Sequence, residues 1–115
     1  MGNPLPVNTH KGTLGELLVQ LRLLEYGIQA AAPIKDSGND LIAIKGEITK
    51  FILVKTENRL REMPLIYHYA AIVELETDAN GSLLLDQSRI WFIKKGEGLS
   101  HKRLLTKDLV EEIFG

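Results

Sequence analysis

The run Phe51-Ile52-Leu53-Val54 is the part of the chain that most restricts its fold. Four consecutive apolar residues leave a strand without a polar face, so a strand here must be covered on both sides. This pattern is typical of the centre of a sheet. Leu41–Lys45 comes before it and Lys50–Thr56 contains it. The four residues between these two runs, Gly46-Glu47-Ile48-Thr49, predict a hairpin with a four-residue loop.

A long amphipathic helix is predicted before this hairpin. Asn8 or Thr9 can cap its start, and Gly27 can end it. Val19 and Leu23 lie on one side of this helix at helical spacing. The other side is a broad apolar face formed by Leu14, Leu17, Leu18, Leu21, Leu24 and Ile28. We therefore expect both sides of the helix to be covered.

The remaining segments alternate between strand signals and turn signals. Strands are expected at Gln29–Ile34, Ile66–Glu76 and Arg89–Lys94, with Ser82–Leu85 as a further short piece. Thr106 can cap a final helix whose inward residues are Leu109, Val110 and Ile113. The order α-β-β-β-α/β-β-α favours an α/β (α+β) fold, in which helices flank a mixed sheet.

Composition excludes several classes of function. The chain has 115 residues, which favours one domain spanning residues 1–115. It contains no cysteine, so a disulfide framework, a thiolate zinc site and a thiol nucleophile are excluded. Fourteen Lys and Arg against 15 Asp and Glu give a net charge of -1, so any DNA contact must come from a local basic patch. Without a signal peptide or a long apolar segment, we expect a cytoplasmic protein with no membrane association.

Two charged residues at the open end of the hairpin are candidates for chemistry. A four-residue loop pairs Lys45 with Lys50, and this register places Asp40 opposite Lys55. The carboxylate could hold Mg²⁺ while the lysine steadies an attacking water or the charge on phosphorus. The alternative is a cross-strand ion pair worth about 0.2 to 1 kcal/mol.

Glu16 adds a third charged group. It lies on the same side of the predicted helix as Val19 and Leu23, where an unpaired carboxylate is costly to bury. A bound cation would remove that cost. Alternatively, Thr13 and Glu16 form a capping box, if the helix begins at Thr13.

Three stretches of the chain match one known family: Lys11-Gly12-Thr13-Leu14-Gly15-Glu16, Asp40-Leu41-Ile42 and Phe51-Ile52-Leu53-Val54-Lys55-Thr56. They resemble the PD-(D/E)XK nuclease superfamily, the restriction-endonuclease-like proteins, and within it the small Holliday-junction-resolvase-like and homing-endonuclease-like members. The resemblance implies a restriction-endonuclease-like core and a Mg²⁺ or Mn²⁺ site. By position, Glu16 and Asp40 would be metal ligands, the Val54 carbonyl a backbone ligand, and Lys55 the catalytic lysine.

Leu53 departs from the family pattern. The family has Glu or Gln two residues before the lysine, and leucine binds neither metal nor water. Glu57 could substitute from the other side of Lys55; the alternative is that it is a solvated residue at the end of the strand. The first hypothesis is therefore a Mg-dependent endonuclease for DNA, weakened by Leu53. The alternative is a catalytically inactive nuclease-fold protein that acts as a nucleic-acid-binding or protein-interaction module.

Basic residues outside this motif are candidates for phosphate contacts. They are Lys11, Arg59, Arg61, Lys94, Lys95, Lys102 and Arg103. A second copy of the chain is a further candidate partner, because the first helix is apolar on two sides.

Overall fold

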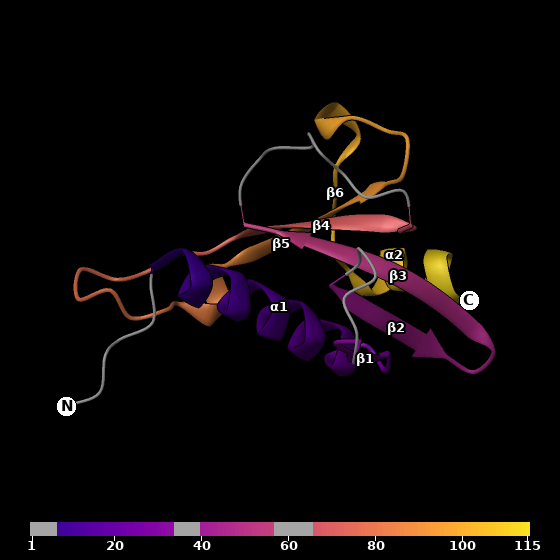
Figure 1. Ribbon diagram of the computed structural model, residues 1–115, viewed down its shortest axis with the longest axis horizontal. Helices are drawn as coiled ribbons and strands as arrows, with labels where there is room; N and C mark the ends of the chain where they lie inside the picture. The colour runs from indigo at the N-terminus through magenta and orange to yellow at the C-terminus, as the bar shows by residue number, and fades with distance from the viewer. Residues whose placement is uncertain (1–6, 34–39, 57–65) are drawn as a thin grey trace.

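The computed structural model describes residues 7–33, 40–56 and 66–115, which form a mixed six-stranded sheet and two helices (Figure 1). This confirms the predicted α+β class. The elements in chain order are α1 (Val7–Glu25), β1 (Gln29–Ala31), β2 (Leu41–Lys45), β3 (Ile48–Lys55), β4 (Tyr69–Glu74), β5 (Arg89–Lys94), β6 (Arg103–Leu104) and α2 (Lys107–Phe114). Two short 3-10 helices flank β5, η1 (Leu85–Gln87) and η2 (Leu99–His101).

The strands lie in the sheet in the same order as in the chain. β3 and β4 are parallel, and all other neighbouring pairs are antiparallel. β3 therefore lies inside the sheet, and Ile52 and Leu53 are buried on its two faces. The prediction of a central strand from its apolar run is confirmed.

The hairpin between β2 and β3 is tighter than predicted. Its loop is the pair Gly46-Glu47, and Lys45 pairs with Ile48 rather than with Lys50. Gly46 has φ +59°, and a two-residue loop with positive φ matches the twist of the flanking strands better than a longer one. The predicted four-residue loop is wrong. Because the register moves by two residues, every side chain stays on its predicted face.

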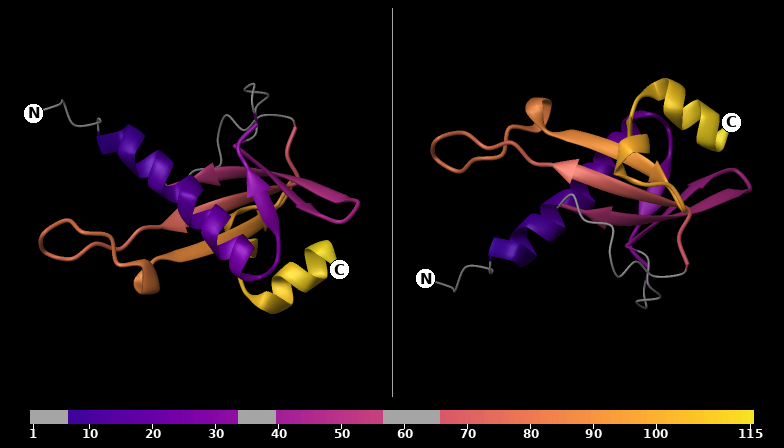
Figure 2. Two further views of the ribbon diagram at one scale, coloured as in Figure 1. Left: turned by 90° about the horizontal axis from the view of Figure 1, so that it is seen from below. Right: turned by 90° about the horizontal axis from the view of Figure 1, so that it is seen from above.

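α1 crosses one face of the sheet, in front of the strands in the left view of Figure 2 and behind them in the right view. Val19 and Leu23 are fully buried there, in the same core as the buried residues of α2. The helix approaches closely at Gly15, where an added Cβ would lie 2.8 Å from Thr56 Cγ2 and 3.5 Å from Val54 Cγ1. The absence of a side chain at Gly15 thus sets how near α1 lies to β3.

Three leucines on the other side of α1 are exposed. Leu17, Leu21 and Leu24 are 54%, 43% and 64% exposed. The expectation that both sides of the helix are covered is therefore wrong for these leucines, because the sheet covers only one side of α1. The predicted end of the helix is correct, since Gly27 has φ +85° directly after the last turn.

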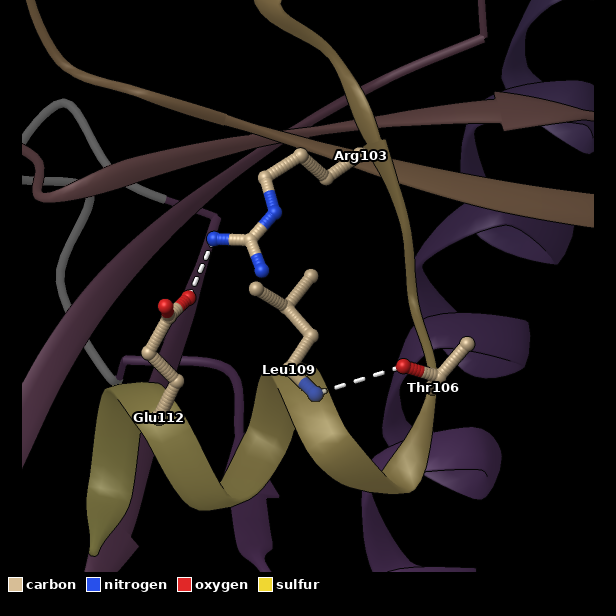
Figure 3. Close-up of polar contacts among 4 residues, drawn as sticks. All are labelled: Arg103, Thr106, Leu109 and Glu112. Atoms are coloured by element: carbon tan, nitrogen blue, oxygen red, sulfur yellow. Dashed lines mark hydrogen bonds and ion pairs between the residues drawn. The ribbon is translucent and has the colours of Figure 1, made fainter.

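α2 is fixed by its cap and by one ion pair (Figure 3). Thr106 Oγ1 accepts a hydrogen bond from the Leu109 backbone N–H at 3.2 Å, as predicted. Arg103 on β6 donates to the Glu112 carboxylate. The inward residues Leu109, Val110 and Ile113 are buried.

Candidate functional site

Asp40 is held beside the end of β3 by two backbone contacts. Its Oδ2 accepts a hydrogen bond from the Val54 N–H at 2.7 Å. Its own N–H donates to the Ile52 carbonyl at 3.1 Å. The observed register places Asp40 across from Leu53 rather than from Lys55. The predicted Asp40–Lys55 opposition is therefore wrong, and within the described residues no ion pair joins these two side chains.

Glu16 lies beside the same end of β3. α1 begins at Val7, so Glu16 is more than two turns inside the helix and cannot form the capping box with Thr13. Gly15, next to it, faces Val54 and Thr56. Partial burial raises the pKa of the Glu16 carboxyl, and the negative charge of Asp40 raises it further. The structure thus brings the carboxylates of Glu16 and Asp40 near enough to repel one another.

Lys55 is the last residue of β3. The side chains of Val54 and Thr56 face Gly15 on α1, and successive strand residues point to opposite faces. Lys55 therefore points to the face of the sheet away from α1, as does the buried Leu53. The hydrogen bond from the Val54 N–H to Asp40 lies in the plane of the sheet, between the face that α1 covers and the face to which Lys55 points.

The oxygen donors here are suited to a hard cation. Within the described ranges, no group of three His, Cys, Asp or Glu side chains could hold a metal. Two carboxylates remain, from Glu16 and Asp40. The Val54 N–H points to Asp40, and the N–H and C=O of one strand residue point to the same side, so the Val54 carbonyl is directed there too. This donor set fits a Mg²⁺ ion that keeps several water ligands.

The basic residues near the C-terminus are divided between two faces. Lys94 and Arg103 line a cleft of about 400 Å³ between the sheet and α2, together with Tyr69 and Glu112. Lys102 points to the other face, since its Nζ lies 4.6 Å from the centre of the Trp91 ring, and the strand register places Trp91 on the face opposite this cleft.

Several of these cations already have partners. Lys102 Nζ lies 3.7 Å from Glu74 Oε1, and Lys95 Nζ lies 5.4 Å from the centre of the Tyr67 ring. Arg103 is paired with Glu112. Neither Glu74 nor Glu112 was predicted as a partner, because only the strand register and the position of α2 bring these carboxylates close to the cations.

Four predicted site residues remain, and the structure describes one of them. Glu57, Arg59 and Arg61 lie outside the described residues. Lys11 is exposed on α1.

No protein-family model matches the chain, and no curated protein matches it. Its fold is similar to the solved structure of a bacterial homing endonuclease, I-Ssp6803I, with a TM-score of 0.52 and 14% sequence identity. The similarity covers 88% of this chain and 79% of that one. The chain therefore shares the fold of a nuclease.

Proposed function

We propose that this chain is a Mg-dependent endonuclease of the PD-(D/E)XK type that hydrolyses phosphodiester bonds in DNA. The observation that carries the proposal is that Asp40 binds the backbone of β3 at Val54 and that α1, with Glu16, packs against the same end of the strand. Partial burial raises the pKa of Glu16 there, and the charge of Asp40 raises it further. Placing like charges together costs stability unless a cation binds between them. The fold shared with a homing endonuclease supports DNA as the substrate.

The residues near the end of β3 have different proposed roles, metal binding for some and charge stabilisation for Lys55. Glu16, Asp40 and the Val54 carbonyl hold Mg²⁺ or Mn²⁺. Such an ion, when bound, lowers the pKa of a water ligand and neutralises charge on the phosphate. Lys55 supplies a positive charge to the attacking water or the phosphate. Leu53 contributes no ligand, so we expect weaker metal affinity than a third carboxylate would give.

Four basic residues near the C-terminus reach the surface: Lys94, Lys95 and Arg103 are exposed, and Lys102 is partly exposed. We assign phosphate contacts to Lys94, Lys95, Lys102 and Arg103, with Arg59 and Arg61 as further candidates. Loss of one such contact lowers the salt dependence of log K by about 0.9. Binding of Lys94→Ala to duplex DNA across a salt series tests this, with Lys107→Ala, outside the cleft lining, as the matched control.

None of the described helices is long and apolar enough to cross a membrane. We propose that residues 1–115 act as one domain in the cytoplasm, in line with the absence of cysteine.

Cleavage assays test the activity directly. Supercoiled, linear, single-stranded, flapped and branched DNA are incubated with the purified chain in Mg²⁺, Mn²⁺ or EDTA. We expect metal-dependent nicking or cleavage that is lost in Asp40→Ala. A clean preparation that cuts none of these DNAs in either metal contradicts the proposal.

A second candidate function is a catalytically inactive module that binds nucleic acid or protein. The burial of Leu53, at 5% exposure, favours it, because an apolar residue packs where the family has a metal-binding side chain. In that case calorimetry detects no Mg²⁺ binding at millimolar concentration, and Leu53→Gln creates it. Tight Mg²⁺ binding by the unchanged chain excludes this candidate.

A further inference from the structure

The outer side of α1 carries four leucines in one line, Leu14, Leu17, Leu21 and Leu24, which we call the leucine stripe. Their spacing alternates between three and four residues, as at the a and d positions of a coiled coil. Leu14 is partly buried, whereas the other three are between 43% and 64% exposed. The stripe points away from the sheet, since Val19 and Leu23 on the opposite side of the helix are buried in the core. α2, the other described helix, does not cross in front of α1 (Figure 2, left).

We propose that the leucine stripe is the interface with a second copy of this chain, in which two α1 helices pack antiparallel about a two-fold axis. A two-fold interface uses the same patch on both copies. In this arrangement Leu14 packs against the partner's Leu24, and Leu17 packs against the partner's Leu21. All four leucines of each helix then lie in the seam.

The charges beside the stripe favour a second copy and fix its direction. Lys11 and Glu25 are both exposed and lie fourteen residues apart, so that together with Leu18, midway between them, they occupy successive e positions of the heptad. Antiparallel packing brings Lys11 opposite the partner's Glu25, twice in each dimer. Parallel packing would instead set the e positions against the partner's g positions, Thr13 and Gln20, which carry no charge, so neither Lys11 nor Glu25 would gain a charged partner there.

Glu25 remains able to make this contact. It accepts a hydrogen bond from Arg22 at 3.3 Å, yet its side chain stays 50% exposed. Lys11, predicted from the sequence as a phosphate contact, pairs with a carboxylate of the second copy in this arrangement. The dimer does not depend on the proposed nuclease activity, because Glu16 faces the sheet on the other side of the helix.

The size of the contact predicts its strength. We expect a contact made by one helix of each copy to bury less than the roughly 1,200 Å² in total that is typical of stable complexes. We therefore expect a dimer that dissociates on dilution.

Sedimentation of the full chain without DNA tests the interface. From low micromolar to near-millimolar concentration, the weight-average mass should rise from that of one chain towards that of two. Leu21→Glu should keep the mass of one chain throughout. Ile44→Glu is the matched control, since Ile44 is 41% exposed on the sheet face away from α1, and it should dimerise like the unchanged chain. Circular dichroism checks that both variants fold.

A charge exchange tests the antiparallel direction. Lys11→Glu alone, or Glu25→Lys alone, should weaken association by roughly 3- to 30-fold, because two attractive pairs become repulsive. The double variant should restore it, whereas a DNA contact at Lys11 would not be restored in this way. The proposal is overturned if the unchanged chain stays monomeric at every concentration, if Leu21→Glu associates normally, or if the double variant is no stronger than the single ones.

Discussion

Charged groups are arranged differently at the two ends of this molecule. Around β6 and α2, opposite charges meet, with Arg103 beside Glu112 and Lys102 beside Glu74. At the end of β3, Glu16 and Asp40 bring like charges together, and within the described residues no ion pair involves either of them.

The difference separates structural charges from candidate functional ones. Exposed pairs such as Arg103–Glu112 contribute at most about 1 kcal/mol to stability. Crowded carboxylates lower stability, and a fold keeps such an arrangement where a ligand or a reaction needs it. Substitutions at the two ends should therefore affect different properties.

The largest difference is expected in activity. Asp40→Asn keeps an oxygen that can accept from the Val54 N–H but removes the charge, so DNA cleavage should fall by at least about 100-fold. Glu111→Gln removes an exposed carboxylate of α2 that is outside the cleft lining and should leave the rate unchanged. Rates are compared in Mg²⁺ at equal concentrations of folded protein. Equal activity of Asp40→Asn and the unchanged chain would contradict the site.

The close approach of α1 predicts a smaller effect, on stability. Gly15→Ala places a methyl group 2.8 Å from Thr56 Cγ2, and such overpacking costs about 1 to 3 kcal/mol. Gly12→Ala meets no atom within 4 Å and should instead stabilise the helix by up to about 1 kcal/mol. Urea unfolding measures both. Thr56→Ser removes the clashing methyl and should recover part of the loss, whereas similar values for the two alanine variants would contradict the packing.

The helix cap at the other end predicts a loss of stability without a loss of chemistry. Thr106→Ala leaves the Leu109 N–H without its side-chain acceptor and should cost about 1 kcal/mol. Thr106→Ser keeps the hydroxyl and should cost less. Cleavage per folded molecule should not change in either variant, and a specific loss of activity in Thr106→Ala would remove the distinction between the two ends.

The smallest effect depends on pH. The pKa of Glu16 is raised above its ordinary 4.5 in the folded chain. Its contribution to stability is therefore full below the unfolded value and is lost as pH rises through the folded value. Glu16→Gln should match the unchanged chain well below pH 4.5 and exceed its stability at neutral pH. Solvent screening limits the gain to about 0.5 kcal/mol. Thermal unfolding without metal measures this gain. A Glu16→Gln variant that is less stable than the unchanged chain at neutral pH would contradict the repulsion between Glu16 and Asp40.

Part of this fold could be predicted from local signals. The apolar run around Ile52 identified the central strand, Gly27 ended α1, and Thr106 capped α2, because each depends on neighbouring residues alone. The hairpin register could not be fixed in the same way, since Ile48 and Thr49 suit a strand as well as a loop. β6, with two residues, is too short to show a periodicity.

The candidate site required information from distant parts of the chain. Glu16 and Asp40 are far apart in the sequence, and their distance depends on how closely Gly15 lets α1 approach β3. The exposure of Leu21 was also unpredictable, because an apolar pattern predicts burial without saying whether the same chain provides the cover.

The single parallel pairing in the sheet has a consequence for folding. β1–β3 and β4–β6 are two antiparallel meanders, each made of contacts between segments near in sequence, and local contacts form faster than distant ones. The seam between β3 and β4 joins the two meanders, and α1 packs across it, since Gly15 faces Val54 on one strand and Val73 on the other. We therefore expect the packing of α1 against β4 to be completed only after the two meanders have joined, which places it late in folding.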